Sequence, residues 1–125
     1  MLMSLNGRKI LIVEDDFSSR LYLNTLLGKS GASLLNASEG QEAFDLVLKN
    51  PDIELVLMDI QMPGVDGYTC TRMIREAGRD LIIIAQTAYG LAGDRERMLT
   101  SGFDDYLIKP ISGASLIQKI EMYLK

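Results

Sequence analysis

Three acidic side chains directly follow two apolar runs of the sequence. Glu14 and Asp15 come after residues 10–13, and Asp59 comes after residues 55–58. Short runs without a polar residue are typical of strands that are buried on both faces of a parallel sheet. Ligands of such sheets bind just outside the carboxyl ends of the strands. We therefore expect the three carboxylates to converge at one edge of a sheet.

Such a cluster predicts a metal site. Crowded carboxylates raise one another's pKa unless a cation relieves the repulsion. Hard oxygen ligands suit Mg²⁺, which keeps several water ligands and is often bound beside a phosphate. The three acids therefore indicate a magnesium site next to a carboxylate that could attack phosphorus.

Strands and helices alternate along the chain that positions these acids. The expected strands are residues 10–13, 33–36, 55–58, 81–85 and 105–108. A helix is expected after each strand, because apolar residues recur there at helical spacing, such as Leu91, Met98 and Leu99 in the fourth. Five strands alternating with five helices predict a doubly wound α/β domain with a parallel sheet.

Polar residues mark the starts of three of these helices. Asp66 and Ser112 are expected to cap the third and the fifth helix, because their side chains can accept from the first free backbone N–H groups. Ser38-Glu39-Gly40-Gln41 matches a capping box, in which Ser38 caps the second helix and Gln41 bonds back to it.

Composition bounds the class of protein. The chain has 125 residues, of which 47% are hydrophobic, and this suits one domain. Residues 8–125 are expected to form it, and residues 1–7 a leader or residues left from cloning. The net charge of −4 disfavours direct binding of nucleic acid or of an anionic membrane, and no apolar run is long enough for membrane insertion.

The histidine and cysteine counts exclude several kinds of site. The sequence has no histidine, which excludes Ser-His-Asp and Cys-His catalysis and histidine-ligated zinc. Cys70 is the only cysteine, so an internal disulfide and a cysteine metal cluster are excluded too. A cytoplasmic protein fits this composition best.

Four motifs together resemble the response-regulator receiver domain of two-component signalling. They are Val13-Glu14-Asp15-Asp16, the segment 58–67 with Asp59 and Pro63-Gly64, Thr87-Ala88, and Lys109-Pro110. They occur in the right order, and the expected strands and helices lie between them. The resemblance implies a single (βα)5 flavodoxin-like domain with strand order 2-1-3-4-5 and a cis peptide bond between Lys109 and Pro110.

The resemblance also implies a role for each site residue. Asp59 matches the phosphoacceptor, since a carboxylate can become an aspartyl phosphate. Asp15, Asp59 and the backbone carbonyl of Gln61 match the ligands of Mg²⁺, with Mn²⁺ as a substitute. Many members have Asp where this chain has Glu14, so we expect Glu14 to contact the cation through water.

Two further residues match phosphoryl ligands, and one matches a switch. Thr87 corresponds to a hydroxyl that bonds a phosphoryl oxygen, and Lys109 to an ammonium that pairs with it. Tyr106 stands where the family often has an aromatic switch residue that responds together with Thr87. Thr87 could instead bond local backbone, and Tyr106 could merely pack at the edge of the core.

The function implied is that of a signalling phosphoacceptor rather than of an enzyme with an external substrate. The phosphoryl donor would be a phosphohistidine on a histidine kinase or on a histidine phosphotransfer protein. The sequences of residues 59–63 and 71–75 resemble those of receiver domains in hybrid histidine kinases. The chain is therefore a stand-alone regulator or a piece of a hybrid kinase or of a longer regulator.

Two other functional classes share some of these features but need a residue or a loop that this chain lacks. A metal-dependent phosphatase with an aspartyl-phosphate intermediate needs a second acid two positions after the nucleophile, and Gln61 stands there. A flavodoxin-like electron carrier needs a phosphate loop after the first strand, where Glu14, Asp15 and Asp16 would repel a flavin phosphate.

Overall fold

The computed structural model describes residues 4–88 and 92–124. Five parallel strands form one sheet in the order β2-β1-β3-β4-β5. The strands are β1 (Lys9–Val13), β2 (Ser33–Ala37), β3 (Ile53–Asp59), β4 (Ile82–Thr87) and β5 (Asp105–Ile108). The helices are α1 (Phe17–Gly28), α2 (Gly40–Lys49), α3 (Gly67–Glu76), α4 (Ala92–Thr100) and α5 (Gly113–Tyr123). The expected fold class and strand order are confirmed.

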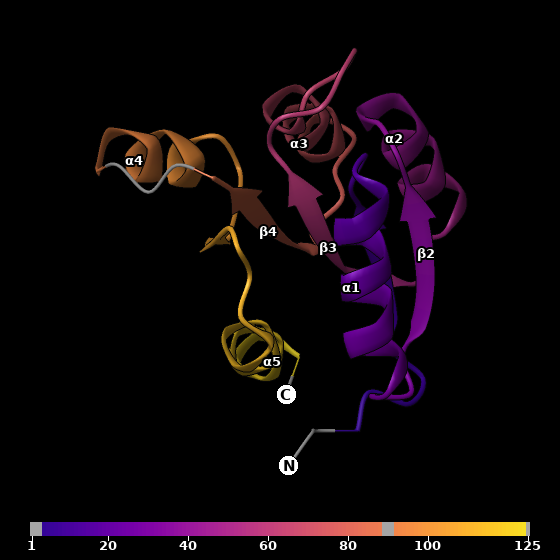
Figure 1. The fold of residues 1–125 in the computed structure, drawn as a ribbon. Coiled ribbons are helices and arrows are strands. Elements are labelled where there is room, and N and C mark those ends of the chain that lie inside the picture. The colour runs from indigo at the N-terminus through magenta and orange to yellow at the C-terminus, as the bar shows by residue number, and fades with distance from the viewer. Residues whose placement is uncertain (1–3, 89–91, 125) are drawn as a thin grey trace.

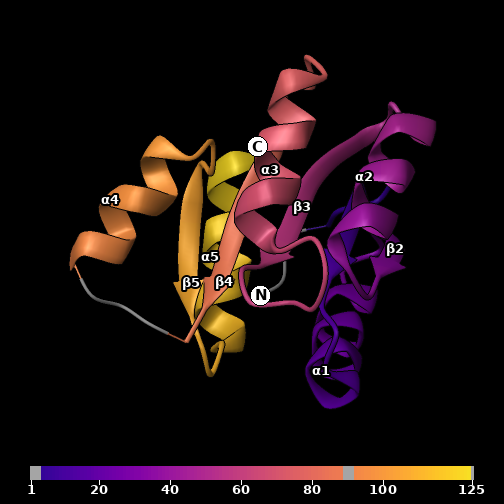
Figure 2. The same cartoon turned by 90° about the horizontal axis from the view of Figure 1, so that it is seen from above.

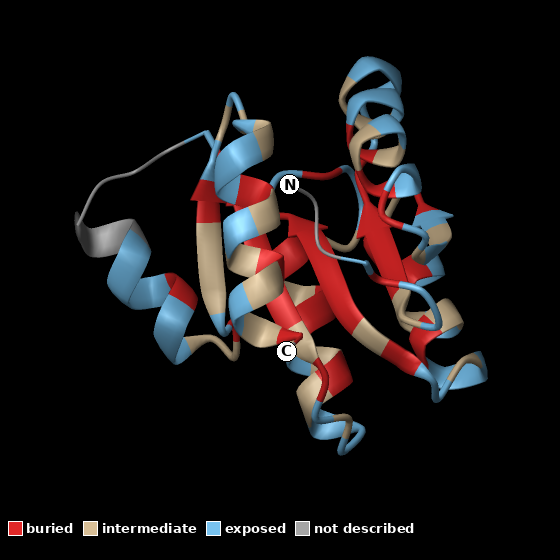
Figure 3. Ribbon diagram, turned by 90° about the horizontal axis from the view of Figure 1, so that it is seen from below, coloured by how far each residue is buried: buried red, intermediate tan, exposed pale blue. Residues whose placement is uncertain are grey.

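Helices cover both faces of the sheet (Figures 1 and 2). Leu55 and Leu57 of β3 belong to a core cluster with residues of α1 and α5. Val56 and Met58 of the same strand belong to a second cluster, with residues of α2, α3 and α4. Alternate residues of a strand point to opposite faces, so one apolar run supplies both cores. Figure 3 shows the result, with largely buried strands and exposed outer helix faces.

The helix caps agree with the sequence except at α2. Asp66 accepts from the backbone N–H of Thr69 at 2.8 Å, and Ser112 accepts from Ser115 at 3.2 Å. The expected capping box is wrong by one residue, because Glu39 is the N-cap of α2 and accepts from the N–H of Glu42 at 3.1 Å.

A pair of carboxylates therefore replaces the expected Ser38 and Gln41 at this helix start. The Glu42 carboxylate accepts from the N–H of Ser38 at 2.8 Å. A charged acceptor bonds backbone N–H groups more strongly than a hydroxyl or an amide does, and the helix dipole favours negative charge there.

The first residues described pack against the body of the domain. Leu5 is buried, and its N–H donates to the carbonyl of Ser30 at 2.7 Å. The expected boundary at residue 8 stays a prediction. Leu91, expected in the fourth helix, lies outside the described residues, and α4 follows at Ala92. Among the described residues, no helix is long and apolar enough to cross a membrane.

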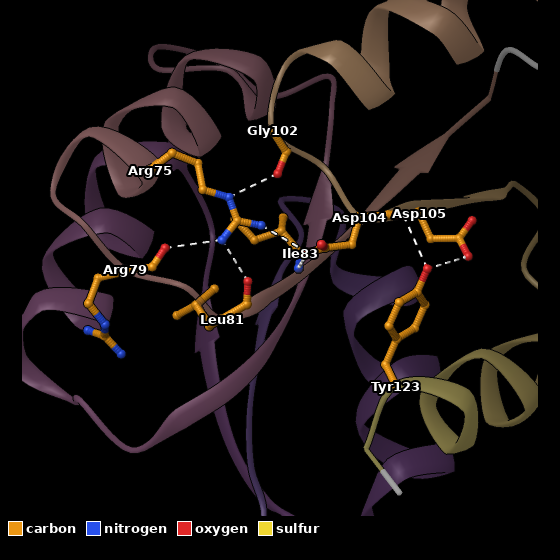
Figure 4. Close-up of polar contacts among 8 residues, drawn as sticks. All are labelled: Arg75, Arg79, Leu81, Ile83, Gly102, Asp104, Asp105 and Tyr123. Carbon is orange, nitrogen blue, oxygen red and sulfur yellow. Dashed lines mark hydrogen bonds and ion pairs between the residues drawn. The ribbon is translucent and has the colours of Figure 1, made fainter.

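Arg75 of α3 connects the amino ends of β4 and β5 (Figure 4). Its guanidinium donates to the carbonyls of Gly102 at 2.9 Å, Arg79 at 3.1 Å and Leu81 at 2.7 Å. It also forms an ion pair with Asp104 at 2.9 Å. One side chain thus satisfies three carbonyls at the end of the sheet opposite the acidic residues.

Candidate functional site

The carboxyl ends of β1 and β3 bring the three acids together. These two strands are parallel neighbours, so their carboxyl ends meet at the same edge. Glu14 and Asp15 follow β1, Asp59 ends β3, and one carboxylate oxygen of each lies within 4.8 Å of the others. Glu14 and Asp59 are buried, whereas Asp15 is exposed. The convergence expected from the two apolar runs is thus present.

Lys109 reaches this cluster from the end of β5. Its Nζ lies 3.3 Å from Glu14 Oε2 and 3.3 Å from Asp59 Oδ2. Its backbone N–H donates to the carbonyl of Thr87 at 2.7 Å, which ties the ends of β4 and β5 together. The Lys109–Pro110 peptide bond is cis, as the resemblance implied. Partial burial lowers the pKa of Lys109, but the charges of Asp59 and Glu14 outweigh this and raise it.

The electrostatics of Glu14 indicate what the cluster can bind. Burial and the nearby Asp59 raise the pKa of Glu14 to about 7, and Lys109 offsets only part of this. An added positive charge would favour the ionised form of all three acids. Carboxylate oxygens at this spacing suit a hard divalent cation. The residues present therefore fit a metal ion.

The loop after β3 orients Asp59. The backbone N–H of Gln61 donates to Asp59 Oδ1 at 3.1 Å, and the Gln61 side chain is exposed. Gly67 begins α3 directly against the backbone of Asp59, where a Cβ would overlap the Asp59 carbonyl. This close approach explains the glycine and sets the path of the loop.

Thr87 and Tyr106 lie on the neighbouring strands β4 and β5. Thr87 ends β4 and is buried, and the strand next to it carries Asp59. Tyr106 is half-buried against the core cluster of α2, α3 and α4. The Lys119 Nζ lies 5.9 Å from the centre of the Tyr106 ring. Their roles as phosphoryl ligand and switch stay predictions.

The sequence analysis missed two residues at the site. Arg20 of α1 donates to the backbone carbonyl of Glu14 at 3.1 Å. Gln86 of β4 lies opposite Asp59 in the β3–β4 register and is 1% exposed. The available signal for Gln86 is a polar residue within the otherwise apolar run 82–86.

A surface cavity of about 610 Å³ adjoins the cluster between α1 and the loop after β5. Its lining residues are Ser18, Ser19, Tyr22, Leu23, Gln86, Lys109, Pro110 and Ile111. Phe17, Leu21 and Tyr22 of α1 are exposed apolar side chains on the same helix. The site thus lies beside a largely apolar surface.

The sequence matches the response regulator receiver domain family over residues 10–121. It is 38% identical over 123 residues to the sensor histidine kinase GacS of Pseudomonas protegens. That alignment covers 94% of this chain and 13% of GacS. This chain thus spans only a small part of that curated relative.

Two solved structures are similar as well. The receiver domain of the sensor histidine kinase PA1611 from Pseudomonas aeruginosa has a magnesium ion coordinated in its active-site cleft. It is 36% identical, with a TM-score of 0.85 and coverage of 94% of this chain and 98% of that one. The receiver domain of Ssk1 from Saccharomyces cerevisiae, solved with the histidine phosphotransfer protein Ypd1, is 30% identical. Its TM-score is 0.87, and the coverage is 98% of this chain and 90% of that chain.

Proposed function

The chain belongs to the response regulator receiver domain family, and we propose that Asp59 accepts a phosphoryl group from a phosphohistidine of a partner protein. The observation that carries the proposal is the environment of Asp59. Its carboxylate lies within the acidic cluster and 3.3 Å from Lys109. A nucleophile, a site for a cation and a fixed ammonium thus lie together, as phosphoryl transfer requires.

Asp15, Asp59 and the backbone carbonyl of Gln61 would hold Mg²⁺, and Glu14 would contact the ion through a water. A bound cation offsets the negative charge of these carboxylates and of the phosphoryl oxygens. The magnesium ion in the PA1611 receiver supports this choice. Mn²⁺ also prefers carboxylate and carbonyl oxygens, so we expect it to substitute.

The residues of the chain then act on the phosphoryl group. An oxygen of Asp59 attacks phosphorus, the bond from phosphorus to the histidine nitrogen breaks, and that nitrogen leaves with the electron pair. The N–H of Gln61 holds the carboxylate in one orientation through its 3.1 Å bond to Oδ1. Lys109 pairs with the phosphoryl oxygens, and the Thr87 hydroxyl donates to one of them.

The donor would be a histidine kinase or a histidine phosphotransfer protein. Tyr22 of α1 lines the cavity together with Lys109 and Pro110. Phe17 and Leu21 are further exposed apolar side chains of the same helix. A partner that docks there would bring its phosphohistidine next to Asp59. The complex of the Ssk1 receiver with Ypd1 supports a partner of this class.

In this proposal the product is the phosphorylated domain itself. The chain catalyses its own phosphorylation and dephosphorylation and converts no external metabolite. The phosphoryl group adds about −1.5 to −2 charges at one edge of the sheet, and the domain then changes its preferred partner. The expected cytoplasmic location stays a prediction.

Phosphorylation of Asp59 can be tested by intact mass. With acetyl phosphate and Mg²⁺, the wild-type chain should gain one phosphoryl group, and Asp59→Asn should gain none because the amide is not a nucleophile of this kind. Asp66→Asn is a matched control, since Asp66 caps α3 and Asn caps a helix equally well. Undiminished labelling of Asp59→Asn would contradict the proposal.

A further inference from the structure

Gln86 is an unusual residue for its position in the sheet. It lies opposite Asp59 in the β3–β4 register and opposite Leu107 in the β4–β5 register. Residues opposite one another in a parallel sheet point to the same face. On that face Leu57, Ile84 and Leu107 are all buried core residues. Gln86 thus lies between Asp59 on one neighbouring strand and a buried leucine on the other.

The Gln86 amide is buried without a partner. Both its nitrogen and its oxygen lack a hydrogen bond to any residue that the structure describes. A buried polar group in this state destabilises a fold, and most native proteins pair such groups. An apolar residue of similar size would avoid this cost, so the amide calls for an explanation other than packing.

Lys109 is the nearby residue whose ammonium can donate a hydrogen bond to this amide. Gln86 and Lys109 line the same cavity. An ammonium has three N–H donors, and the Lys109 ammonium contacts two carboxylates, Glu14 and Asp59. Under the proposed function both carboxylates become engaged, Asp59 by the phosphoryl group and Glu14 by the cation. Lys109 then needs another acceptor on the side away from the phosphoryl oxygens.

We propose that Gln86 is a positioning residue for Lys109 in the phosphorylated domain. The Gln86 side-chain oxygen accepts a hydrogen bond from the Lys109 ammonium and holds it toward the phosphoryl oxygens. In the unphosphorylated domain the amide has no hydrogen-bond partner, and in the phosphorylated domain it is the acceptor for Lys109. This inference rests on the proposed function, because it needs a phosphoryl group on Asp59.

The first test is a spectroscopic one on the wild-type chain. Beryllofluoride with Mg²⁺ mimics the phosphoryl group, and ¹⁵N spectra report the side-chain NH₂ group of Gln86. We expect its resonances to shift and its hydrogen exchange to slow when the mimic binds. Unmoved Gln86 resonances in a chain that binds the mimic would overturn the inference. A wild-type chain that neither binds the mimic nor becomes phosphorylated would overturn the proposed function instead.

The second test separates positioning from packing. Gln86→Met keeps the approximate shape but removes the acceptor, and we expect the dissociation constant for beryllofluoride to rise about tenfold, as for one hydrogen bond to a charged group. Its melting temperature should not fall, because an unpartnered buried amide is removed. A variant that binds beryllofluoride as tightly as the wild type would overturn the inference.

Thr71→Val is the matched control for Gln86→Met. The Thr71 hydroxyl is also buried and has no hydrogen-bond partner among the described residues, but it lies on α3. This variant removes a comparable polar group on the other face of the sheet. We expect it to bind beryllofluoride like the wild type. An equal loss of affinity in both variants would mean that the Gln86 effect comes from packing, and would overturn the inference.

Discussion

Asp15 differs from the other two acids of the cluster because it is exposed. Glu14 and Asp59 are buried and are neutralised in part by Lys109, whereas Asp15 has no ion pair among the described residues. A hydrated cation that arrives from solvent therefore meets Asp15 first. The affinity for the cation should depend strongly on this residue, although it contributes little to the packing of the fold.

Asp15→Asn should weaken Mg²⁺ binding about tenfold or more, because it removes one charge and one strong oxygen ligand. The chain has no tryptophan, so isothermal titration calorimetry is a suitable measurement. Asp16→Asn is the control, since Asp16 is exposed and caps α1 by accepting from Ser19 at 2.8 Å. If Asp15→Asn titrates Mg²⁺ like the wild type, the metal site is wrongly placed.

The sequence predicts a site residue best where it follows an apolar run or belongs to a recognisable motif. Asp59 follows an apolar run, so its convergence with Glu14 and Asp15 follows from the topology of a parallel sheet. Lys109 was predicted from the Lys109-Pro110 motif of the family resemblance. Gln86 has no such mark, because its place opposite Asp59 depends on the strand register. Arg20 was missed for a related reason, since it contacts a backbone carbonyl, which any residue at position 14 would offer.

At the scale of elements, the acidic site and the Arg75 network lie at opposite edges of the same parallel sheet. Arg75 binds backbone carbonyls around the amino ends of β4 and β5, and Asp104 accepts from the N–H of Ile83 at 2.8 Å (Figure 4). Such bonds to fixed backbone groups leave little freedom. The amino ends of these strands should therefore stay in place when the carboxyl ends respond to phosphorylation.

Arg75→Met should lower the free energy of unfolding by about 2–4 kcal/mol, because three carbonyls lose the guanidinium as donor and Asp104 loses its ion pair. Chemical denaturation with urea measures this difference. Arg72→Met is the control, since Arg72 is exposed on the same helix, and its stability should stay close to that of the wild type. A loss of less than about 0.5 kcal/mol in Arg75→Met would contradict the role assigned to this network.

Tyr123 connects α5 to the start of β5, and its ionisation makes the stability of the fold depend on pH in the alkaline range. Its hydroxyl donates to Asp105 at 3.0 Å (Figure 4), and partial burial together with Asp105 raises the pKa of Tyr123 to about 12. The folded state therefore holds this proton more tightly than the unfolded state. This contribution to stability is complete below about pH 10 and is lost as the pH rises toward 12.

Tyr123→Phe should accordingly lose less stability than the wild type between about pH 10 and pH 12. Thermal unfolding at a series of pH values measures the difference, and the absorbance of ionised tyrosine gives the pKa directly. Tyr22→Phe is a suitable control, because Tyr22 donates to the carbonyl of Ile111 rather than to a carboxylate. Identical alkaline profiles for Tyr123→Phe and the wild type would contradict the assignment.

The helices and strands were predicted well from the sequence, because short apolar runs mark the strands and apolar residues at helical spacing mark the helices. Apolar runs predicted each strand to within about two residues, and the fifth matched its bounds, Asp105–Ile108. The start of α2 was missed by one residue, since Ser38, Glu39 and Gln41 can all accept a backbone N–H. Sequence alone does not rank such acceptors, because the outcome depends on the path of the chain before the helix.

At the scale of the whole molecule, the start of α3, which directly follows the loop after Asp59, contacts α4. Arg97 of α4 lies over the ring of Tyr68 at 4.0 Å. The Tyr68 ring also meets Phe103 edge-on, with 5.8 Å between ring centres. Gln61 and Asp66 line the same surface hollow as Tyr68 and Arg97. A shift of this loop on phosphorylation would therefore reach α4 and the segment before β5.

The last prediction is that the response to phosphorylation spreads over residues 92–111. Thr87 ends β4 and Lys109 directly follows β5, so drawing both toward one phosphoryl group displaces the segments that follow these strands. Packed helices and strands respond to such a displacement by shifting from one discrete arrangement to another. Tyr106 is half-buried on β5 with Lys119 beside its ring, so an amphipathic side chain there can change its exposure.

Amide chemical shifts with and without beryllofluoride and Mg²⁺ measure this response. We expect changes around Met98, Tyr106 and Ile111, and much smaller ones at the amino ends of the strands, where Arg75 binds fixed backbone groups. Asp59→Asn is the control, because beryllofluoride needs the Asp59 carboxylate. The spectrum of this variant should not change when the mimic is added. If the wild-type shift changes stay within the acidic cluster and the shifts of residues 92–111 do not change, the surface formed by residues 92–111 is not the switch. The change in partner binding must then come from α1 and the cavity beside it.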